Sequence, residues 1–348
     1  MPEETISPAD LAMCECESCK RKAGLPSRVT PGTIHSYSSM PRSGWVARRT
    51  SDPADLSAPT FGIELETDVP ECQYRELGGR PNMPLLSWAA TVDERAAYDA
   101  AQSALYAWDD RNTAYRRRQR ADWMAAGNMT AEEAVSVAEP RGLWHPKHDG
   151  SVTGPEFASQ PGTLAYWHEQ RPHIVSMFRA LLHGGMRSHD GDRCGMHVNI
   201  GTEAFGDAEH LERWMALIAH NARWTTRMSQ RTHSSQRSWA SYEPISTPER
   251  RRDIARQVFD YGYASTSHCS AVNASHSGRI EFRVPRGTLR LDRFYAKLEW
   301  VAAMVEFTRD ASNATTPAAF TRWAEARAAE YPALVTYMRE RFSARFAA

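Results

Sequence analysis

Residues 60–68 read TFGIELETD and carry the first strong strand pattern of the chain. Apolar residues alternate there with Glu64 and Glu66. Because successive side chains of a strand point to opposite faces of its sheet, the alternation predicts one apolar face and one acidic face. The stretch therefore predicts a strand that buries one side and presents two carboxylates on the other.

Two later stretches repeat this alternation, CGMHVNIG at 194–201 and RIEFRVP at 279–285. In the first, His197 and Asn199 oppose the apolar side chains. In the second, Glu281 and Arg283 do so. Three separate strands are therefore each expected to carry a fully apolar face and a face of groups that can bind metal or phosphate.

Residues 147–160 form a further strand region, in which Gly154–Pro155 breaks the register. Asp149, Ser151 and Glu156 are its candidates for the polar face. A solvated face of an antiparallel sheet gives the same alternation, so each strand alone is ambiguous. The residue types favour a site, because a solvated face is typically rich in Thr, Lys and Gln, whereas these strands offer Glu, His, Asn and Arg.

The spacing of Glu64 and Glu66 also favours a bound cation. Two glutamates two positions apart on one face repel each other, and a cation between them removes that repulsion. Clustered oxygen ligands with one imidazole suit Mg²⁺ or Mn²⁺ better than zinc, which prefers thiolate and imidazole.

Helical patterns lie between and after the strands. They cover residues 164–184 and 207–229, and an amphipathic pattern begins at Leu291 with one or two helices after it. A short strand is expected at 268–273. Few scattered strands with helices between and after them indicate an α+β fold.

The composition divides the chain into an arm and one larger domain. Residues 1–58 are rich in Ser, Pro and Arg and lack periodicity, which predicts a poorly ordered or loosely docked arm. Residues 59–348 are expected to form the domain. Within it, residues 71–145 are predicted to be a helical insert and residues 288–348 the C-terminal helices.

Composition excludes several classes of protein. The 348 residues contain 42 Lys+Arg against 42 Asp+Glu, and this balance argues against general nucleic-acid binding. The mean hydropathy is −0.58, and no apolar run approaches the roughly 18 residues that span a bilayer, so no membrane association is expected. Residues 1–11 lack the basic and apolar regions of a signal peptide, which predicts a cytoplasmic protein. Six cysteines then indicate thiols or metal ligands rather than a disulfide framework.

Four segments in the same order resemble the amidoligase family, part of the carboxylate–amine ligase superfamily that includes glutamine synthetase and glutamate–cysteine ligase. The segments are FGIELE at 61–66, DGS at 149–151 with Glu156, CGMHVNIG at 194–201, and Asn273 with RIEFRVPRGTL at 279–289. The resemblance runs from about residue 33 to 310. The chain departs from the family pattern in two places: the third motif usually reads His-x-His but has Asn199 here, and the insert at 71–145 is longer than expected.

The resemblance implies a curved, mainly antiparallel sheet of the glutamine-synthetase catalytic type, with helices packed on its outer face. Its concave polar face would hold ATP and Mg²⁺ or Mn²⁺. The implied activity joins a carboxylate to an amine through an acyl phosphate, with phosphoryl transfer assisted by metals and arginine. The sequence leaves open whether the acceptor is a free amino acid, a peptide, a protein or a wall-derived fragment, and it leaves the oligomeric state open.

The resemblance also implies roles for single residues. Glu64 and Glu66 would each ligate one of two metal ions. Glu156 would complete the site of Glu66, and His197 and Glu281 would share the site of Glu64.

Further roles concern the phosphoryl group and the substrates. Arg283 would stabilise the transferring phosphoryl group or orient the substrate carboxylate, since its planar fork suits either. Arg286 is a second cation for the nucleotide, and Asn199 stands where the family has its second histidine. Asn273 and Asp149 are candidates for orienting the substrate or the amine.

The arm contains a possible metal knuckle of its own. Cys14, Cys16 and Cys19 are closely spaced, and His35 would supply the fourth ligand that a structural zinc site needs. The other interpretation is that these are free thiols on a flexible arm.

Two functions other than a ligase remain open. The first is a catalytically inactive binding or assembly protein that keeps the sheet, for which Asn199 is the main support. The second is a nucleic-acid-associated factor that uses the cysteine knuckle and the arginine-rich stretch at 111–120. Acidic residues border that stretch, so a solvated helix is the simpler interpretation.

Overall fold

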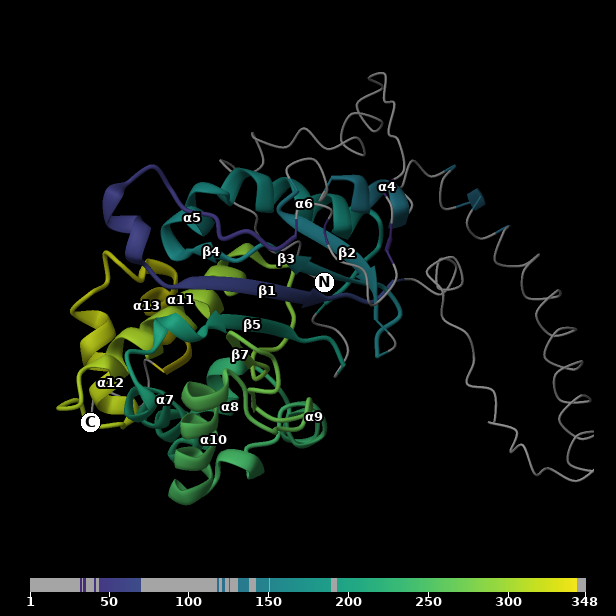
Figure 1. Ribbon diagram of the computed structural model, residues 1–348. Coiled ribbons are helices and arrows are strands. Elements are labelled where there is room, and N and C mark those ends of the chain that lie inside the picture. The colour runs from purple at the N-terminus through teal and green to yellow at the C-terminus, as the bar shows by residue number, and fades with distance from the viewer. Residues whose placement is uncertain are drawn as a thin grey trace, which may run out of the picture.

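The computed structural model describes residues 44–69, 131–137, 142–149, 151–188 and 193–342, together with a few isolated residues before position 126. These residues form an α+β fold with one open sheet, as the sequence predicts (Figure 1). None of the helices in the described part of the chain is long and apolar enough to cross a membrane.

The sheet has seven strands in the order β2-β3-β1-β5-β7-β6, with β4 paired to β1. They are β1 (Thr60–Glu66), β2 (Trp144–His148), β3 (Pro155–Ser159), β4 (Gly162–Thr163), β5 (Met196–Gly201), β6 (Val272–Asn273) and β7 (Arg279–Phe282). Every pairing between these strands is antiparallel. The predicted antiparallel character of the sheet is therefore confirmed.

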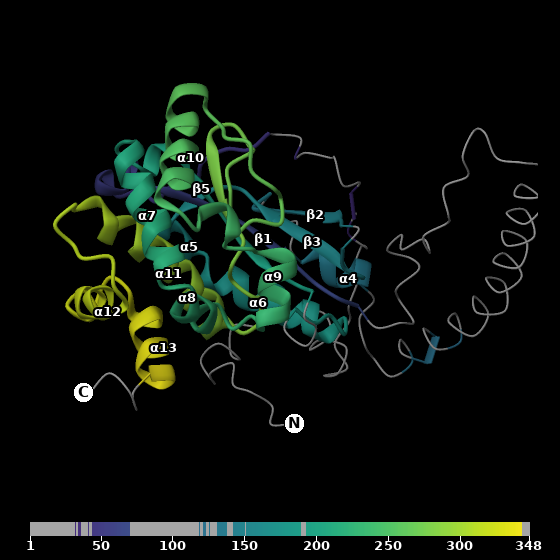
Figure 2. The same ribbon diagram turned by 90° about the horizontal axis from the view of Figure 1, so that it is seen from below.

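The helices gather mainly on one side of this sheet. They are α4 (Ala131–Ser136), α5 (Leu164–Glu169), α6 (Arg171–His183), α7 (Ala208–His220), α8 (Ala222–Ser229), α9 (His233–Trp239), α10 (Pro248–Tyr261), α11 (Leu291–Arg309), α12 (Pro317–Glu325) and α13 (Pro332–Phe342). Short 3-10 turns lie at Pro53–Ser57, Thr202–Ala204 and Glu243–Ile245. Figure 2 shows α5, α6, α7 and α11 on the same face of the sheet.

The apolar face of the strands forms the core with these helices. Phe61, Ile63 and Leu65 of β1 are all buried. Phe282 of β7 lies between two indoles, with ring centroids 5.5 Å from Trp214 of α7 and 5.5 Å from Trp300 of α11. Such edge-to-face contacts add specific geometry to the apolar area that burial removes from water. The strand alternation thus directs its apolar side chains inward, which leaves the polar side chains on the other face.

Two helices predicted as single elements are each divided in two. The predicted helix 164–184 breaks at Gln170, because Pro172 starts a new helix and has no N–H for the preceding one. The predicted helix 207–229 breaks at Asn221. The Asn221 side chain donates to the carbonyl groups of Leu217 and Thr315, at 2.8 and 2.9 Å, and so ties this turn to another part of the chain.

The region between residues 230 and 267 contains two helices that the sequence analysis missed, α9 and α10. Their sequences are polar, but α10 carries the usual boundary signals. Thr247 caps its first turn by accepting from the Arg250 amide, and Gly262 ends it in the left-handed conformation at φ 84°. The predicted strands 268–273 and 279–285 are shorter in the structure, where they are β6 and β7.

Residues 44–58 of the predicted arm dock on the sheet through specific hydrogen bonds. The Arg48 amide donates to the Pro161 carbonyl at 2.7 Å. The Thr163 hydroxyl donates to the buried Asp55 carboxylate at 2.7 Å. This part of the arm is therefore integral to the domain, while the rest falls almost entirely outside the described residues. The same holds for most of the insert at 71–145, of which the structure describes mainly α4 and the start of β2.

A buried carboxylate joins two of the C-terminal helices. Glu299 of α11 is fully buried, and its carboxylate accepts from the Leu334 amide in the first turn of α13 at 2.8 Å. Its other oxygen lies 3.4 Å from Nε2 of His168. Burial raises the pKa of Glu299 to about 7, although the amides of Leu334 and Ala333 lower it.

This raised pKa predicts a stability change with pH. The carboxyl group holds its proton more tightly in the folded than in the unfolded state, so protonation of Glu299 stabilises the fold fully below pH 4.5, and this stabilisation is lost as the pH rises through 7. The free energy of unfolding of the wild type should therefore fall by about 2 kcal/mol over that range relative to Glu299→Gln, which has no titrating group at this position. The measurement is the difference in free energy of unfolding between wild type and variant at each pH. An identical pH dependence in both proteins would contradict the assignment, and Glu306→Gln, at an exposed position of α11, is the control.

Candidate metal centre

The antiparallel register brings polar side chains of six strands to one face of the sheet. Directly paired residues of neighbouring strands point to the same side. The pairs that carry polar groups are Glu64 with His197, Glu66 with Glu156, Lys147 with Glu156, Asn199 with Glu281, and Asn273 with Glu281. All of them lie on the face opposite the core helices.

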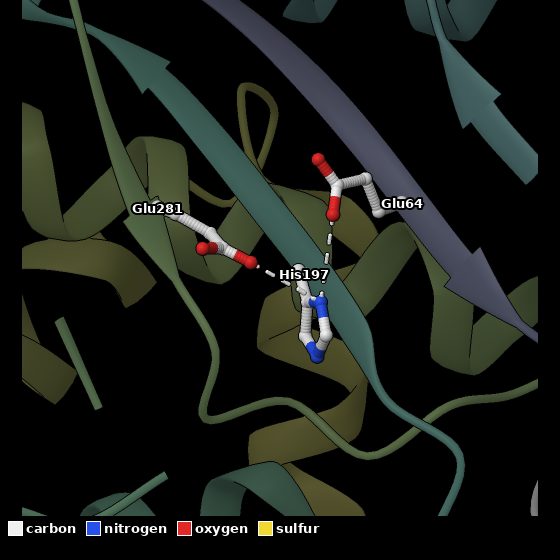
Figure 3. A group of neighbouring side chains, drawn as sticks. All are labelled: Glu64, His197 and Glu281. Carbon is white, nitrogen blue, oxygen red and sulfur yellow. Dashed lines mark ion pairs between the residues drawn. The ribbon is translucent and has the colours of Figure 1, made fainter. Parts of the chain in front are cut away.

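Glu64, His197 and Glu281 meet at the centre of this face (Figure 3). Nδ1 of His197 lies 3.7 Å from a carboxylate oxygen of Glu64 and 3.2 Å from one of Glu281. One ligand atom from each of the three residues lies within 4.8 Å of the other two. The three residues are far apart in sequence, so the adjacency of β1, β5 and β7 creates this triad of Glu64, His197 and Glu281.

Hydrogen bonds hold the two carboxylates in place. Asn199 donates its side-chain amide to Glu64 at 3.0 Å, and Asn273 donates to Glu281 at 2.7 Å. Arg283 also donates to Glu281 at 2.5 Å. Groups that orient ligands in this way are a common feature of metal sites.

The buried imidazole of His197 is held in its charged form. Burial and the nearby Arg283 disfavour the charge, but the carboxylates of Glu66, Glu281 and Glu64 outweigh them and raise the pKa to about 9. Burial likewise favours a neutral Glu281, yet His197 and Arg283 hold the pKa of that carboxyl well below its usual range. The imidazolium therefore supplies positive charge at the point where a metal ion would supply it.

A second group of acids lies next to the first. Nε2 of His197 is 3.7 Å from Glu66, which also accepts a short hydrogen bond from the Gly195 amide. Burial and the negative charge of Glu64 raise the pKa of Glu156 well above its usual range, despite the Lys147 ammonium 3.1 Å away. A buried acid kept neutral by neighbouring negative charge is ready to ionise when a cation arrives.

The donor set fits a hard divalent cation. Carboxylate oxygens with one imidazole suit Mg²⁺ or Mn²⁺, and the two carboxylates of the triad are already oriented. Asn199 adds a buried Oδ1 that has no hydrogen-bond partner among the described residues and faces the same side as Glu64. Glu66 and Glu156 are paired across the strands, and Asp149 forms a hydrogen bond with Glu156, so a second ion beside these acids would take further ligands from substrate or water.

The structure places the other expected residues in different surroundings. Asn273 is buried, and its Oδ1 accepts from Thr266 and Ser275, so its side chain serves the Glu281 carboxylate and a local turn. Asp149 accepts from the Ser151 amide and hydroxyl, both at 2.6 Å, and its carboxyl group also forms a hydrogen bond with that of Glu156, beside the triad. Arg286 lines a second, separate cavity of about 430 Å³.

The proposed zinc ligands lie largely outside the described residues. Cys14, Cys16 and Cys19 are among the residues that the structure does not describe. His35 forms an isolated parallel bridge with Lys147, and its ring stacks on His145 with centroids 4.3 Å apart. In the described part of the chain, His35 is thus joined to the edge of the sheet by a single bridge.

A cavity of about 440 Å³ adjoins the triad on the side of Asn199. Glu64 and Asn199 form part of its wall, and Trp45, Lys147 and Arg279 supply an aromatic ring and two cations. The sequence analysis assigned no role to these three. The alternation of His145, Lys147 and Asp149 would have identified Lys147, but Pro146 hides the strand pattern because proline is unusual inside a strand.

No family model matches the chain, and a search of curated proteins finds no match either. The interpretation of the site therefore depends on its own geometry and on the sequence motifs.

Gly195 is a further residue of the candidate site, because any side chain at this position would clash with the imidazole of His197. A Cβ at this position would lie 2.5 Å from Nε2 of His197 and 2.6 Å from the guanidinium of Arg231. Arg231 is buried and donates to the carbonyl groups of Val284 and Arg283, so it cannot easily move.

We expect Gly195→Ala to displace His197 and destabilise the fold by about 1–3 kcal/mol, the usual cost of overpacking. The measurements are Mn²⁺ affinity and the free energy of unfolding. Gly206→Ala is the matched control, because a Cβ there meets nothing within 4 Å. Equal behaviour of the two variants would show that Gly195 does not limit the geometry of the centre.

The protonated state of His197 predicts that Mn²⁺ binding strengthens as the pH rises. A metal ion must displace the proton, and the imidazole holds it up to a pH of about 9. We expect the association constant to increase by up to about tenfold per pH unit between pH 6.5 and 8.5. Isothermal titration calorimetry in buffers of different ionisation enthalpy measures both the affinity and the proton released. Affinity independent of pH, with no proton release, would argue against His197 as a ligand.

Proposed function

We propose that the chain is an ATP-dependent carboxylate–amine ligase, which forms an amide or isopeptide bond through an acyl phosphate. The main support is the convergence of Glu64, His197 and Glu281 on the polar face of an antiparallel sheet. These residues come from three separate sequence motifs that resemble the amidoligase family. The sheet is proposed to be of the glutamine-synthetase catalytic type, with its helices on the outer face.

The reaction explains why such a site is needed. A carboxylate resists attack by an amine, because it is anionic and has no good leaving group. Transfer of the γ-phosphoryl group of ATP to the carboxylate oxygen gives an acyl phosphate and ADP. The amine then attacks the acyl carbon, and phosphate leaves as the amine loses a proton. The phosphoryl step requires neutralised phosphate oxygens and in-line positioning.

The residues of the polar face are suited to these steps. Mg²⁺ or Mn²⁺ held by Glu64, His197 and Glu281 would neutralise charge on the phosphate oxygens. Arg283 already contacts Glu281, and its guanidinium can also bind the oxygens of a phosphoryl group or a carboxylate in a bidentate manner.

Glu66, Glu156 and Asp149 form the acidic end of the same face. Their neighbourhood is proposed to hold a second ion and the substrate carboxylate or amine. Because Asn273 is committed to Glu281, we assign it the positioning of that ligand rather than a contact with substrate.

The cavity beside Asn199 is the proposed nucleotide site. Glu64 is part of its lining, so a triphosphate bound there would lie near the triad. Trp45 offers a ring on which a base can stack, and Lys147 and Arg279 offer positive charge for phosphate oxygens.

A non-catalytic binding or assembly protein is the second candidate function. The observation that favours it is Asn199, which stands where the family has a histidine. In the structure Asn199 donates to Glu64 at 3.0 Å, so it still orients a ligand of the metal centre. This contact favours an active site over a degenerate one.

We expect ATP with Mg²⁺ to stabilise the wild-type protein against heat and Glu64→Ala to abolish the shift, because ligand binding to the folded state raises its stability. Glu209→Gln, at an exposed position of α7, is the control and should keep the shift. No thermal shift at saturating nucleotide would favour the non-catalytic alternative.

Turnover is the direct test of the ligase. We expect release of ADP when the protein is screened against pools of carboxylates and amines, with a product lighter by one water than its parts in mass spectrometry. Glu66→Gln and Arg283→Lys should each reduce turnover by at least about a hundredfold while the circular dichroism spectrum is unchanged. Arg322→Lys, exposed on α12, should behave as wild type. Full turnover in both site variants would refute the assignment.

A further inference from the structure

The cavity beside the metal centre extends along the polar face of the sheet, away from the triad. Glu64, Gly62 and Thr60 alternate along β1, so they share this face, and all three line the cavity. Four residues of a strand span about 13 Å, which is the separation of Thr60 from Glu64 along β1. We define the distal end of the cavity as the part farthest from the triad, lined by Thr60, Gly201, Glu203 and Arg279.

Gly62 leaves open space in the middle of this wall. Its φ is not in the left-handed range, so the backbone conformation does not require a glycine. The nearest atom that a Cβ would meet, outside the adjoining residues, is Cβ of Asn199 at 3.5 Å, which is an ordinary contact distance. A side chain at position 62 would instead enter the cavity. The glycine therefore allows a ligand to lie directly against the strand.

The carboxylate of Glu203 lies over the second glycine of the wall, Gly201. A Cβ on Gly201 would overlap the carboxylate oxygens, so these oxygens occupy the polar face where a side chain of β5 would otherwise stand. The buried Thr60 hydroxyl donates to this carboxylate at 3.3 Å, which is the only hydrogen bond of the Glu203 side chain among the described residues. Glu203 therefore presents accepting oxygens to the distal end of the cavity.

Arg279 supplies a hydrogen-bond donor at the same end. It pairs with Gly201 across β7 and β5, and it lines the cavity. Its Nε is buried and has no hydrogen-bond partner in the part of the chain that the structure describes. Arg279 and Glu203 form no ion pair with each other there. The distal end thus offers both an accepting carboxylate and a donating guanidinium to a ligand.

We propose that Glu203 accepts hydrogen bonds from the ribose hydroxyl groups of the bound nucleotide and so makes the site selective for ribonucleotides. The inference rests on the proposed ligase, whose triphosphate would lie at the Glu64 end of the cavity. The ribose then lies toward the distal end, because the length of this wall is comparable to that of a nucleoside triphosphate. Arg279 is placed to bind the phosphate group nearest the ribose. Hydroxyl groups form charge-assisted hydrogen bonds with a carboxylate, and a carboxylate is a usual partner of ribose in nucleotide sites.

The exposure of Glu203 sets the size of the expected selectivity. A site that hydrogen bonds a substrate hydroxyl disfavours an analogue that lacks it, because the polar group of the site is left without its partner. Glu203 is exposed, so water can replace the missing hydroxyl groups. We therefore expect a difference in affinity of about tenfold, well below the discrimination of a fully buried polar site.

The test compares ATP with 2′,3′-dideoxy-ATP, which lacks both hydroxyl groups. Each is titrated by calorimetry into the full chain with Mg²⁺. We expect the wild type to bind ATP about tenfold more tightly, and Glu203→Ala to bring the ratio of the two affinities close to one. The ratio is the informative quantity, because removal of a negative charge near the triphosphate affects both nucleotides alike. Glu209→Ala, at an exposed position of α7, should keep the wild-type ratio.

A second variant, Gly62→Val, tests where the nucleotide lies. Valine is favoured in strands and the protein leaves room for its Cβ, so the fold should be retained. Its side chain would fill the cavity, and the affinity for both nucleotides should fall by at least about tenfold. Gly206→Val is the matched control, because a Cβ there meets nothing within 4 Å and the residue does not line the cavity.

Failure of this inference and failure of the proposed function give different results. The ribose contact is overturned, and the ligase is left intact, if the wild type binds the two nucleotides equally or if Glu203→Ala keeps the wild-type ratio. Full binding of ATP by Gly62→Val would also overturn it. If the wild type binds neither nucleotide, the proposed ATP-dependent function fails, and the ribose contact fails with it.

Discussion

Repulsion among carboxylates that share one face of the sheet is the constraint on which this arrangement depends. Glu64, Glu66 and Glu281 all approach one imidazole, at 3.7, 3.7 and 3.2 Å. In a buried setting such charges interact strongly, because little water screens them. His197 and Arg283 balance the acids in the structure, and burial together with the charge of Glu64 raises the pKa of Glu156. A divalent cation would balance the acids with greater charge density, and its binding would release protons from the centre.

The packing of the apolar face keeps the strands that carry Glu64, His197 and Glu281 in register. A shift of one residue in any of the strands β1, β5 or β7 would turn its ligand into the core and an apolar side chain outward. Phe282 between Trp214 and Trp300 makes such a shift costly on the apolar face. Packing on one side of the sheet therefore fixes the chemistry on the other. The docked segment 44–58 adds to this by hydrogen bonding to residues 160–163, which join the end of β3 to β4, and by placing Trp45 at the adjoining cavity.

The residues of the centre were predictable from sequence because their signal is local. Alternation with period two identified Glu64, Glu66, His197 and Glu281 without knowledge of their neighbours. The pairing of β1 with β5 and of β5 with β7 is a long-range property that alternation does not encode. Lys147 was missed because β2 contains Pro146, which is tolerated only because β2 lies at the edge of the sheet. Arg286 was assigned to the nucleotide by its place in the motif at 279–289, but it forms a bridge with Gly195 and its side chain lines the second cavity.

The wide separation of the three ligands along the chain has a consequence for biosynthesis. Glu64 leaves the ribosome first, His197 follows 133 residues later, and Glu281 emerges 84 residues after His197. Helix α11, which covers the apolar side of these strands, comes later still. A nascent chain that ends before Glu281 lacks the complete triad. An ion could therefore bind all three side chains only after β7, the last strand along the described chain, has been synthesised.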